Sequence, residues 1–306
     1  MRDRAAGVAF LFAGQGSQTV GMGSQLVAGC AHCRAIFDAV DAALGYPLSQ
    51  IVAGGPEADL RRTAVAQPAI LALSVAHARH LQALGIQPQM LAGHSLGQYS
   101  ALVVARALDL PNSVKLVSER GRLMQETVPE GIGAMMAIVG LDRERVYAAC
   151  DAARPMGEVS VASHNSPGQT VISGTRDAVE AAAEQCEAEG GGAVPLAVSA
   201  PFHSQLLAPM VPAFARLIEA TPFAVPSIPV IDNVTARPLS NAAAVRRSLV
   251  TQITSPVLFE ESLQLMFDAG IDRFVQCGPG KSLLGFARRV APRAELLTFE
   301  EALACG

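Results

Sequence analysis

The sequence predicts an α/β protein with a parallel-sheet core and a small inserted subdomain. At both ends of the chain, short apolar runs bounded by turn residues alternate with segments of helical periodicity, which is typical of parallel strands joined by helices. The middle of the chain has the order β-α-β-β-α-β, which is the ferredoxin-like arrangement. Half of the 306 residues are hydrophobic and 16% are charged, so the chain can bury a large core.

The N-terminal third contains the first strands of the predicted parallel sheet. Val8–Phe12 is a continuous apolar run that ends at a glycine-rich turn, as a buried parallel strand does. Helical patterns then continue to Leu84, and a second strand is expected around Met90–Ala92. Helices are expected next, over about Gly97–Ala107 and Asn112–Glu126.

The middle third is interpreted as a separate small subdomain over residues 129–198. It interrupts a discontinuous larger domain formed by residues 1–128 and 199–306. Turn residues at Ser166-Pro167-Gly168 separate two of its strands. Its strands are expected at Ala134–Val139, Val159–His164, Thr170–Ser173 and Ala193–Val198, and its helices at Arg143–Ala153 and Asp177–Glu189.

The α/β pattern returns in the last third. A helix is expected from Ser204, and further helices follow to Ala269. Strands are expected at Ile228–Ile231 and Arg273–Cys277, and a final helix at Ser282–Arg289.

Charge and hydropathy exclude two classes of partner. The net charge is −4 and forms no blocks, whereas a nucleic-acid surface needs a concentrated basic patch. No apolar run approaches the ~18 residues of a membrane span. Arg2 and Arg4 precede a short apolar run as in a signal peptide, but no small-residue cleavage site follows, so a buried first strand is expected instead.

The six cysteines form no paired framework, which predicts reduced thiols and a cytoplasmic protein. Cys30 and Cys33 form a lone C-x-x-C motif around His32. A zinc site would need a second ligand pair, and none lies at a suitable spacing. The sequence therefore gives little support to a metal or redox role for this pair.

Gly93-His94-Ser95-Leu96-Gly97 matches the G-x-S-x-G pattern of a nucleophile elbow. It follows a predicted strand and begins a predicted helix, which is the context that such an elbow requires. The backbone N–H of Leu96, at the helix N-terminus, is then a natural donor to a developing oxyanion. The alternative interpretation is a tight turn in which Ser95 merely caps the helix.

His203 is the best candidate for the base that a serine nucleophile needs. It lies in a loop at the end of a predicted strand, where sites in parallel α/β sheets gather. His77 and His80 lie three apart on an apolar helix and are interpreted as structural. No carboxylate near His203 suggests itself as the third member of a triad, so a backbone carbonyl is a candidate for that place.

No nucleotide cofactor is predicted, because two glycine motifs are incomplete. Gly14-Gln15-Gly16 would need glycine at position 19 for a dinucleotide fingerprint, where the chain has Thr19. Gly280-Lys281-Ser282 would need glycine at position 275 for a phosphate loop, where the chain has Val275.

Arg120 lies on the apolar stripe of its helix, three residues after Val117 and four before Met124. An arginine on a buried face needs an anionic partner, because an unpaired buried charge is very costly. That partner is either a carboxylate of the protein, in a structural ion pair, or a substrate carboxylate held by the planar guanidinium.

These motifs resemble those of the malonyl-CoA:acyl-carrier-protein transacylases and the related acyltransferases of polyketide synthesis, in the same order and over nearly the whole chain. The segments that carry the resemblance are FAGQGSQTVGMG (12–23), TAVAQPAI (63–70), GHSLGQYSALV (93–103), RGRLMQ (120–125), HNSPGQTVISG (164–174), APFHS (200–204), QITSPVLF (252–259) and CGPGKSLLG (277–285).

The resemblance implies an α/β-hydrolase-like catalytic domain and a set of functional residues. Ser95 is then the acyl nucleophile and His203 the general base and acid. The expected supporting residues are Gln15 and Leu96 as the oxyanion hole through their backbone N–H groups, Arg120 for the malonyl carboxylate, Gln252 for orienting the base through its backbone carbonyl, and Phe202, Asn165, Met124 and Gln67 as the substrate pocket.

The implied reaction is a ping-pong transfer of malonyl from malonyl-CoA to the phosphopantetheine thiol of an acyl carrier protein, without metal or bound cofactor. Ala13 replaces a usual proline, Gln98 a usual glutamate and Phe202 a smaller residue. The last two departures resemble discrete polyketide acyltransferases, so both fatty-acid and polyketide pathways fit.

Three alternatives are considered, of which two are enzymes and the third belongs to a different class. An acyl hydrolase that proofreads polyketide synthesis has a similar sequence, but such relatives tend to lack the arginine that this chain has at Arg120. The malonyl-transferring subunit of a malonate decarboxylase performs the same chemistry on a different carrier. A catalytically inactive carrier-binding scaffold is disfavoured by the intact Ser95 and His203.

Overall fold

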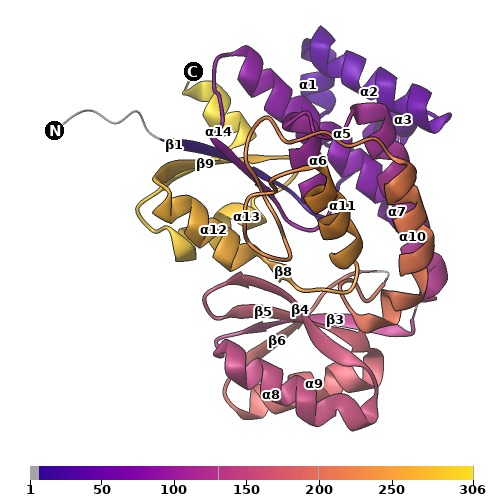
Figure 1. Ribbon diagram of the computed structural model, residues 1–306, viewed down its shortest axis with the longest axis vertical. Coiled ribbons are helices and arrows are strands. Elements are labelled where there is room, and N and C mark those ends of the chain that lie inside the picture. The colour runs from indigo at the N-terminus through magenta and orange to yellow at the C-terminus, as the bar shows by residue number, and fades with distance from the viewer. Residues whose placement is uncertain (1–6, 130, 199, 306) are drawn as a thin grey trace.

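A computed structural model of the protein describes residues 7–129, 131–198 and 200–305. Arg2 and Arg4 of the signal-like N-terminus lie outside the described residues. The chain forms two five-stranded sheets, one in each of two stacked units (Figure 1). No helix in the described ranges is both long enough and apolar enough to cross a membrane.

The larger unit is built on a parallel sheet with β1 at its centre. The strands are paired in the order β10-β9-β1-β2-β7, all parallel. Residues 9–12 of β1 are fully buried, because helices cover both faces of such a sheet and leave no polar side to the strand. The strands are β1 (Gly7–Phe12), β2 (Met90–Gly93), β7 (Val230–Ile231), β9 (Ile271–Cys277) and β10 (Glu295–Thr298).

Helices from both ends of the chain pack around this sheet. The longest, α5 (Thr63–Ala83), packs against α2, α6 and α7 and is buried along most of its length. The Asp109 carboxylate caps α7 by accepting from the backbone N–H of Asn112 at 2.8 Å. The others are α1 (Ser24–Gly29), α2 (Ala31–Leu44), α3 (Leu48–Gly54), α4 (Glu57–Arg61), α6 (Gly97–Val104), α7 (Leu110–Thr127), α10 (Val211–Ala220), α11 (Ala242–Thr251), α12 (Phe259–Asp268), α13 (Ser282–Val290) and α14 (Phe299–Ala304).

The smaller unit is a second sheet covered by two helices, α8 (Arg143–Ala153) and α9 (Arg176–Ala188). Its strand order is β6-β3-β5-β4-β8, and every pair except β4·β8 is antiparallel. Figure 1 shows α8 and α9 on the face turned away from the larger unit. The strands are β3 (Gly133–Val139), β4 (Val159–Ser166), β5 (Gln169–Thr175), β6 (Gly192–Pro195) and β8 (Val257–Leu258).

The predicted fold class is confirmed, and the differences lie in short elements. The strand expected at Ala193–Val198 ends at Pro195, and the helix expected from Ser204 starts as a 3-10 turn, η2 (Gln205–Met210), before α10. β8, β10 and α14 were not expected. A two-residue strand such as β8 carries too few residues for any periodicity, so only its pairing with β4 reveals it.

The second sheet includes β8, which lies outside residues 129–198. The sheet therefore extends beyond the segment that was expected to form the small subdomain. Glu130 and Ser199, at the two expected boundaries, lie outside the described residues. The domain limits therefore stay a prediction.

Candidate active site

Ser95 lies in the turn between β2 and α6, with a φ of 53° in the left-handed region. Close packing explains both glycines around it. A Cβ on Gly93 would lie 1.9 Å from the carbonyl carbon of Gly97, and a Cβ on Gly97 would lie 2.1 Å from the carbonyl oxygen of Phe12. The turn therefore has the strained strand-to-helix geometry of a nucleophile elbow and presents Ser95 at the carboxyl end of the sheet.

Asn233 holds this turn in place. Its side-chain oxygen accepts from the Ser95 backbone N–H at 2.8 Å, and its side-chain nitrogen donates to the Gly93 carbonyl at 2.7 Å. Sequence reasoning missed this residue. Its position two residues after the strand expected at Ile228–Ile231 was the available signal, because polar side chains at the carboxyl ends of parallel strands tend to be functional.

Gln98 continues the same network and is fully buried. Its side-chain oxygen accepts from the Asn233 backbone N–H at 2.8 Å, and its side-chain nitrogen donates to the Ser248 hydroxyl at 2.7 Å. Ser248 in turn donates to the Asp232 carboxylate. A glutamate at position 98 could not make the donation to Ser248, so the amide matches the partners that this chain provides.

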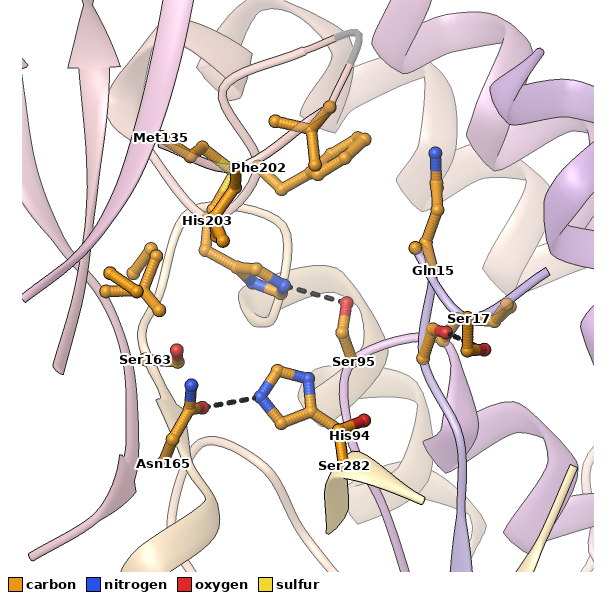
Figure 2. A pocket seen from close by; sticks show the side chains of 18 of the residues that line it. Gln15, Ser17, His94, Ser95, Met135, Ser163, Asn165, Phe202, His203 and Ser282 are labelled. Carbon is orange, nitrogen blue, oxygen red and sulfur yellow. Dashed lines mark hydrogen bonds between the residues drawn. The ribbon is translucent and has the colours of Figure 1, made fainter. Parts of the chain in front are cut away.

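The structure brings His203 to Ser95. Nε2 of His203 lies 2.7 Å from the Ser95 hydroxyl oxygen (Figure 2). Its Nδ1 lies 2.9 Å from the Gln252 carbonyl oxygen and 3.2 Å from that of Ser255. Two backbone carbonyls thus occupy the place of a triad carboxylate. They fix a proton on Nδ1, which leaves Nε2 free to accept one.

Burial is the main reason that the pKa of His203 is lowered to about 3, and the nearby positive charge of Arg120 adds to the effect. The imidazole is therefore neutral at physiological pH. A neutral imidazole in contact with a serine hydroxyl can act as a general base.

Arg120 reaches the same site from α7, and its side chain is almost fully buried, with 2% exposed. One terminal nitrogen donates to the Gln67 side-chain oxygen at 3.0 Å. The other donates to the Gln252 side-chain oxygen at 3.1 Å and to the Ser95 hydroxyl at 3.3 Å. The guanidinium also lies 5.4 Å from the centre of the Tyr99 ring, within reach of a cation–π contact.

All of these protein partners of Arg120 are neutral. Within the described ranges, no carboxylate forms a salt bridge with Arg120, so the structural ion pair that the sequence left open is not found there. Its Nε is buried without a hydrogen-bond partner. Burial lowers the pKa of Arg120, which expresses the cost of keeping this cation away from water. A bound anion beside Arg120 would offset that desolvation cost.

A pocket of about 350 Å³ opens over Ser95 between the two sheets. The larger unit contributes the 14–17 loop, the elbow and the His203 loop, and β3, β4 and β5 contribute the opposite wall. The residues expected at the site that line this pocket are Ser95, His203, Gln15, Leu96, Arg120, Phe202 and Asn165.

Gln67 and Met124 were expected to line the pocket, but in the structure they lie behind the lining residues. Both are fully buried, and neither is among the lining residues. The Gln67 side-chain nitrogen contacts the Met124 sulfur at 3.6 Å and the Gln15 side-chain oxygen at 3.4 Å, while its oxygen holds Arg120. The lining residues that sequence reasoning missed include Met135, Ser163, Gln169, Ser282 and Phe286.

A contact across the pocket joins the elbow to the smaller unit. His94 Nε2 lies 2.8 Å from the side-chain oxygen of Asn165 on β4 (Figure 2). The His94 ring also packs edge-on against Phe259. Burial lowers the pKa of His94, so the neutral ring donates to Asn165. This hydrogen bond joins two residues that line the pocket from opposite units.

Comparison with known proteins finds a matching family model and similar relatives. Residues 9–289 match the family model of the acyl transferase domain. The malonyl CoA-acyl carrier protein transacylase of Escherichia coli strain K12 is 43% identical over 284 residues, which are 92% of each chain.

Two solved structures are also similar. An acyl carrier protein S-malonyltransferase from Vibrio cholerae matches with a TM-score of 0.95 at 41% identity, over 98% of this chain and 100% of that one. A structure of a type II PKS acyl-carrier protein in complex with its malonyl-transacylase matches with a TM-score of 0.94 at 39% identity, over 98% and 100% of the two chains.

Proposed function

The chain belongs to the acyl transferase domain family, and we propose that it transfers a malonyl group from malonyl-CoA to the phosphopantetheine thiol of an acyl carrier protein. As a member of this family it is an acyltransferase. The names of its relatives favour malonyl as the acyl group and an acyl carrier protein as the partner. The proposed location is the cytoplasm, where the six free cysteines would stay reduced.

The observation that carries the malonyl assignment is the buried guanidinium of Arg120 beside Ser95, with only neutral protein partners. A malonyl group keeps one free carboxylate, both in the coenzyme A thioester and as the ester on the serine. Arginine binds a carboxylate with two parallel hydrogen bonds, and such charge-assisted bonds are the strongest in proteins. An acetyl group has no anion to offer, so this site favours malonyl.

In the first half of the proposed reaction, His203 Nε2 takes the proton of the Ser95 hydroxyl as the oxygen attacks the thioester carbonyl. The carbonyl oxygen becomes an oxyanion, which the backbone N–H groups of Gln15 and Leu96 would stabilise. The intermediate then collapses, the carbon–sulfur bond breaks, and the imidazolium returns its proton to the coenzyme A sulfur. Malonyl remains as an ester on Ser95.

In the second half, the phosphopantetheine thiol of the carrier replaces coenzyme A. His203 takes the thiol proton, and the sulfur attacks the ester carbonyl. When the carbon–oxygen bond breaks, His203 returns the proton to Ser95, and malonyl leaves on the carrier. The proposal needs no metal and no cofactor bound to this chain, because the proton and the acyl group move between named atoms.

The two backbone carbonyls that accept from His203 Nδ1 suit proton transfer in both half-reactions. A carboxylate there would stabilise the imidazolium and raise the pKa of the histidine. Neutral carbonyls fix the tautomer and add no negative charge next to the malonyl carboxylate. The base thus stays neutral between the two half-reactions and can serve both.

Mass spectrometry of the intact protein tests the proposal. After incubation with malonyl-CoA, the protein should gain one malonyl mass on the peptide that contains Ser95, and Ser95→Ala should lose it. Ser282→Ala is the matched control, because Ser282 is a second hydroxyl that lines the same pocket, and it should still be labelled. A label that persists in Ser95→Ala would overturn the assignment.

Adding a carrier protein with its phosphopantetheine arm separates transfer from hydrolysis. The malonyl mass should move from Ser95 to the carrier, and the ester should persist when the carrier is absent. Rapid loss of the label to water, at a rate that the carrier does not change, would instead identify an acyl hydrolase.

A further inference from the structure

Cys30, Cys33 and His80 meet at a point where α2 begins beside the end of α5. Cys30 caps the N-terminus of α2, Cys33 lies one turn into that helix, and His80 comes from the last turn of α5. Their ligand atoms, the two sulfurs and one imidazole nitrogen, all lie within 4.8 Å of one another. The sequence showed only the C-x-x-C pair, because the histidine is 50 residues away from Cys30.

The spacing of these atoms fits one tetrahedral metal ion. Zinc bonds sulfur at about 2.3 Å and imidazole nitrogen at about 2.0–2.1 Å, so two such ligands at a tetrahedral angle lie about 3.6 Å apart. The Cys30 sulfur and Nδ1 of His80 are 3.6 Å apart. We propose that Cys30, Cys33 and His80 form a binding site for a thiophilic divalent metal ion of the zinc type, with solvent as the fourth ligand.

The Cys30 sulfur accepts a backbone hydrogen bond at the start of α2. The backbone N–H of Cys33 donates to the Cys30 sulfur at 3.2 Å, and the sulfur sits at the positive end of the α2 dipole. Both interactions remain available to a sulfur that is bound to a metal ion. A thiolate is the form that binds zinc.

Cys33 is fully buried, whereas Cys30 is half-buried. Zinc binds the thiolate form of cysteine, so a cation that binds both sulfurs displaces the Cys33 proton. The alternative contact of this thiol is the Ala76 carbonyl at 4.0 Å, which is the outer limit for a sulfur hydrogen bond.

Access and geometry favour a metal over a simple disulfide. Cys30 and His80 are half-buried, so an ion can enter and a water molecule can complete its shell. A disulfide between Cys30 and Cys33 would give the histidine no role. The presence of Nδ1 of His80 against the Cys30 sulfur is the feature that a metal site explains.

The site lies far from the proposed chemistry. Residues 67 and 80 of α5 are thirteen positions apart, which is roughly 20 Å of helix. Figure 1 shows α2 at the end of the molecule opposite the smaller sheet. A bound ion would therefore tie α2 to α5 and stabilise the fold, and it would leave the acyl transfer step unchanged.

Cobalt titration of the full-length, reduced and chelator-treated protein tests the proposal. Co²⁺ should bind one equivalent, with thiolate-to-cobalt charge-transfer absorption and the intense visible bands of tetrahedral cobalt, and Zn²⁺ should remove both. His80→Ala and Cys30→Ser should each weaken binding at least tenfold. His32→Gln and Cys305→Ser should leave it unchanged, because both are exposed and lie outside the cluster.

A melting curve gives a readout that does not depend on absorption. Zn²⁺ should raise the melting temperature of the parent protein by several degrees and that of His80→Ala much less. The proposal is overturned if reduced protein shows no thiolate–cobalt absorption, or if His80→Ala binds cobalt as tightly as the parent. It is also overturned if Cys305→Ser abolishes binding.

Discussion

The buried guanidinium of Arg120 places a positive charge in the lining of the pocket, beside Ser95. Arg120 is held in place by two glutamine side chains, from Gln67 and Gln252, so its position does not depend on substrate. Each glutamine accepts one hydrogen bond from a terminal nitrogen, while Nε has no partner and the positive charge is left uncompensated. The site is therefore already formed for a ligand that brings a negative charge.

Replacing this cation should discriminate between substrates. Arg120→Ala is expected to lower kcat/KM for malonyl-CoA much more than for acetyl-CoA, because only malonyl carries the anion. Loss of a charged hydrogen bond costs about 1.5–3 kcal/mol, which is roughly a ten- to hundredfold loss. Arg122→Ala is the control, since Arg122 is exposed on the same helix and pairs with Glu119 and Glu126. Equal losses for both substrates would make Arg120 purely structural.

Phe202 should control tolerance for substituents on the malonyl α-carbon. Its ring lines the pocket directly before His203, and overfilling a packed site costs about 1–3 kcal/mol. We expect the parent to prefer malonyl-CoA over methylmalonyl-CoA by one to two orders of magnitude, and Phe202→Ser to reduce that preference. Relative kcat/KM values and a melting curve measure it.

Phe286→Ser is the matched control for Phe202, because Phe286 lines the same pocket from α13. It should change stability without changing the substrate ratio. A Phe202→Ser variant that loses stability but keeps the parental ratio would place Phe202 in the core and withdraw its role in selectivity.

At the scale of elements, the catalytic geometry depends on how closely α6 approaches β1. Gly97 begins α6 against the Phe12 carbonyl, and no side chain fits between them. This approach, together with the hydrogen bonds of Asn233, sets the position of the Ser95 turn. The position of the elbow thus depends on tertiary packing as well as on residues 93–97 themselves.

Two helix glycines should respond oppositely to alanine. Gly97→Ala places a Cβ 2.1 Å from the Phe12 carbonyl oxygen, so it should destabilise the fold by several kcal/mol, as overpacking and backbone shifts do. Gly285→Ala in α13 meets no atom within 4 Å and should stabilise the protein by up to about 1 kcal/mol through helix propensity. Urea unfolding measures both. Similar effects at the two positions would contradict the packing argument.

At the scale of the whole molecule, the fold buries several histidines in their neutral form. Burial lowers the pKa values of His77 and His203 to about 3, and His77 also stacks on Phe299 at a ring distance of 3.7 Å. Their unfolded pKa is about 6.5. Between pH 6.5 and 3 the unfolded chain therefore binds more protons, so stability falls as the pH falls through this window.

Removing His77 should flatten this dependence. Each such histidine contributes a slope of up to about 1.4 kcal/mol per pH unit to the free energy of unfolding. His77→Gln should lose about that much slope between pH 6 and 4. Urea unfolding from pH 8 to 4 with a chelator present measures it, and the difference at pH 8 reports any loss of packing separately. An unchanged slope would show that His77 is not buried in its neutral form.

The sequence by itself determined the α/β class, the order of most elements, the elbow at Ser95 and the buried position of Arg120. These features depend on neighbours within a few residues, through apolar periodicity and turn glycines, so local patterns carry them. Resemblance to a family supplied the expected roles, including that of the Gln252 carbonyl.

Only the tertiary structure decided which groups meet. Asn233 reaches Ser95 across 138 positions and Gln252 reaches Arg120 across 132, while Gln67 supports the arginine from behind. The pairing of β4 with β8 and the meeting of His80 with Cys30 are likewise invisible in local patterns. Such contacts are set by how sheets and helices pack on one another, and periodicity along the chain holds no information about that packing.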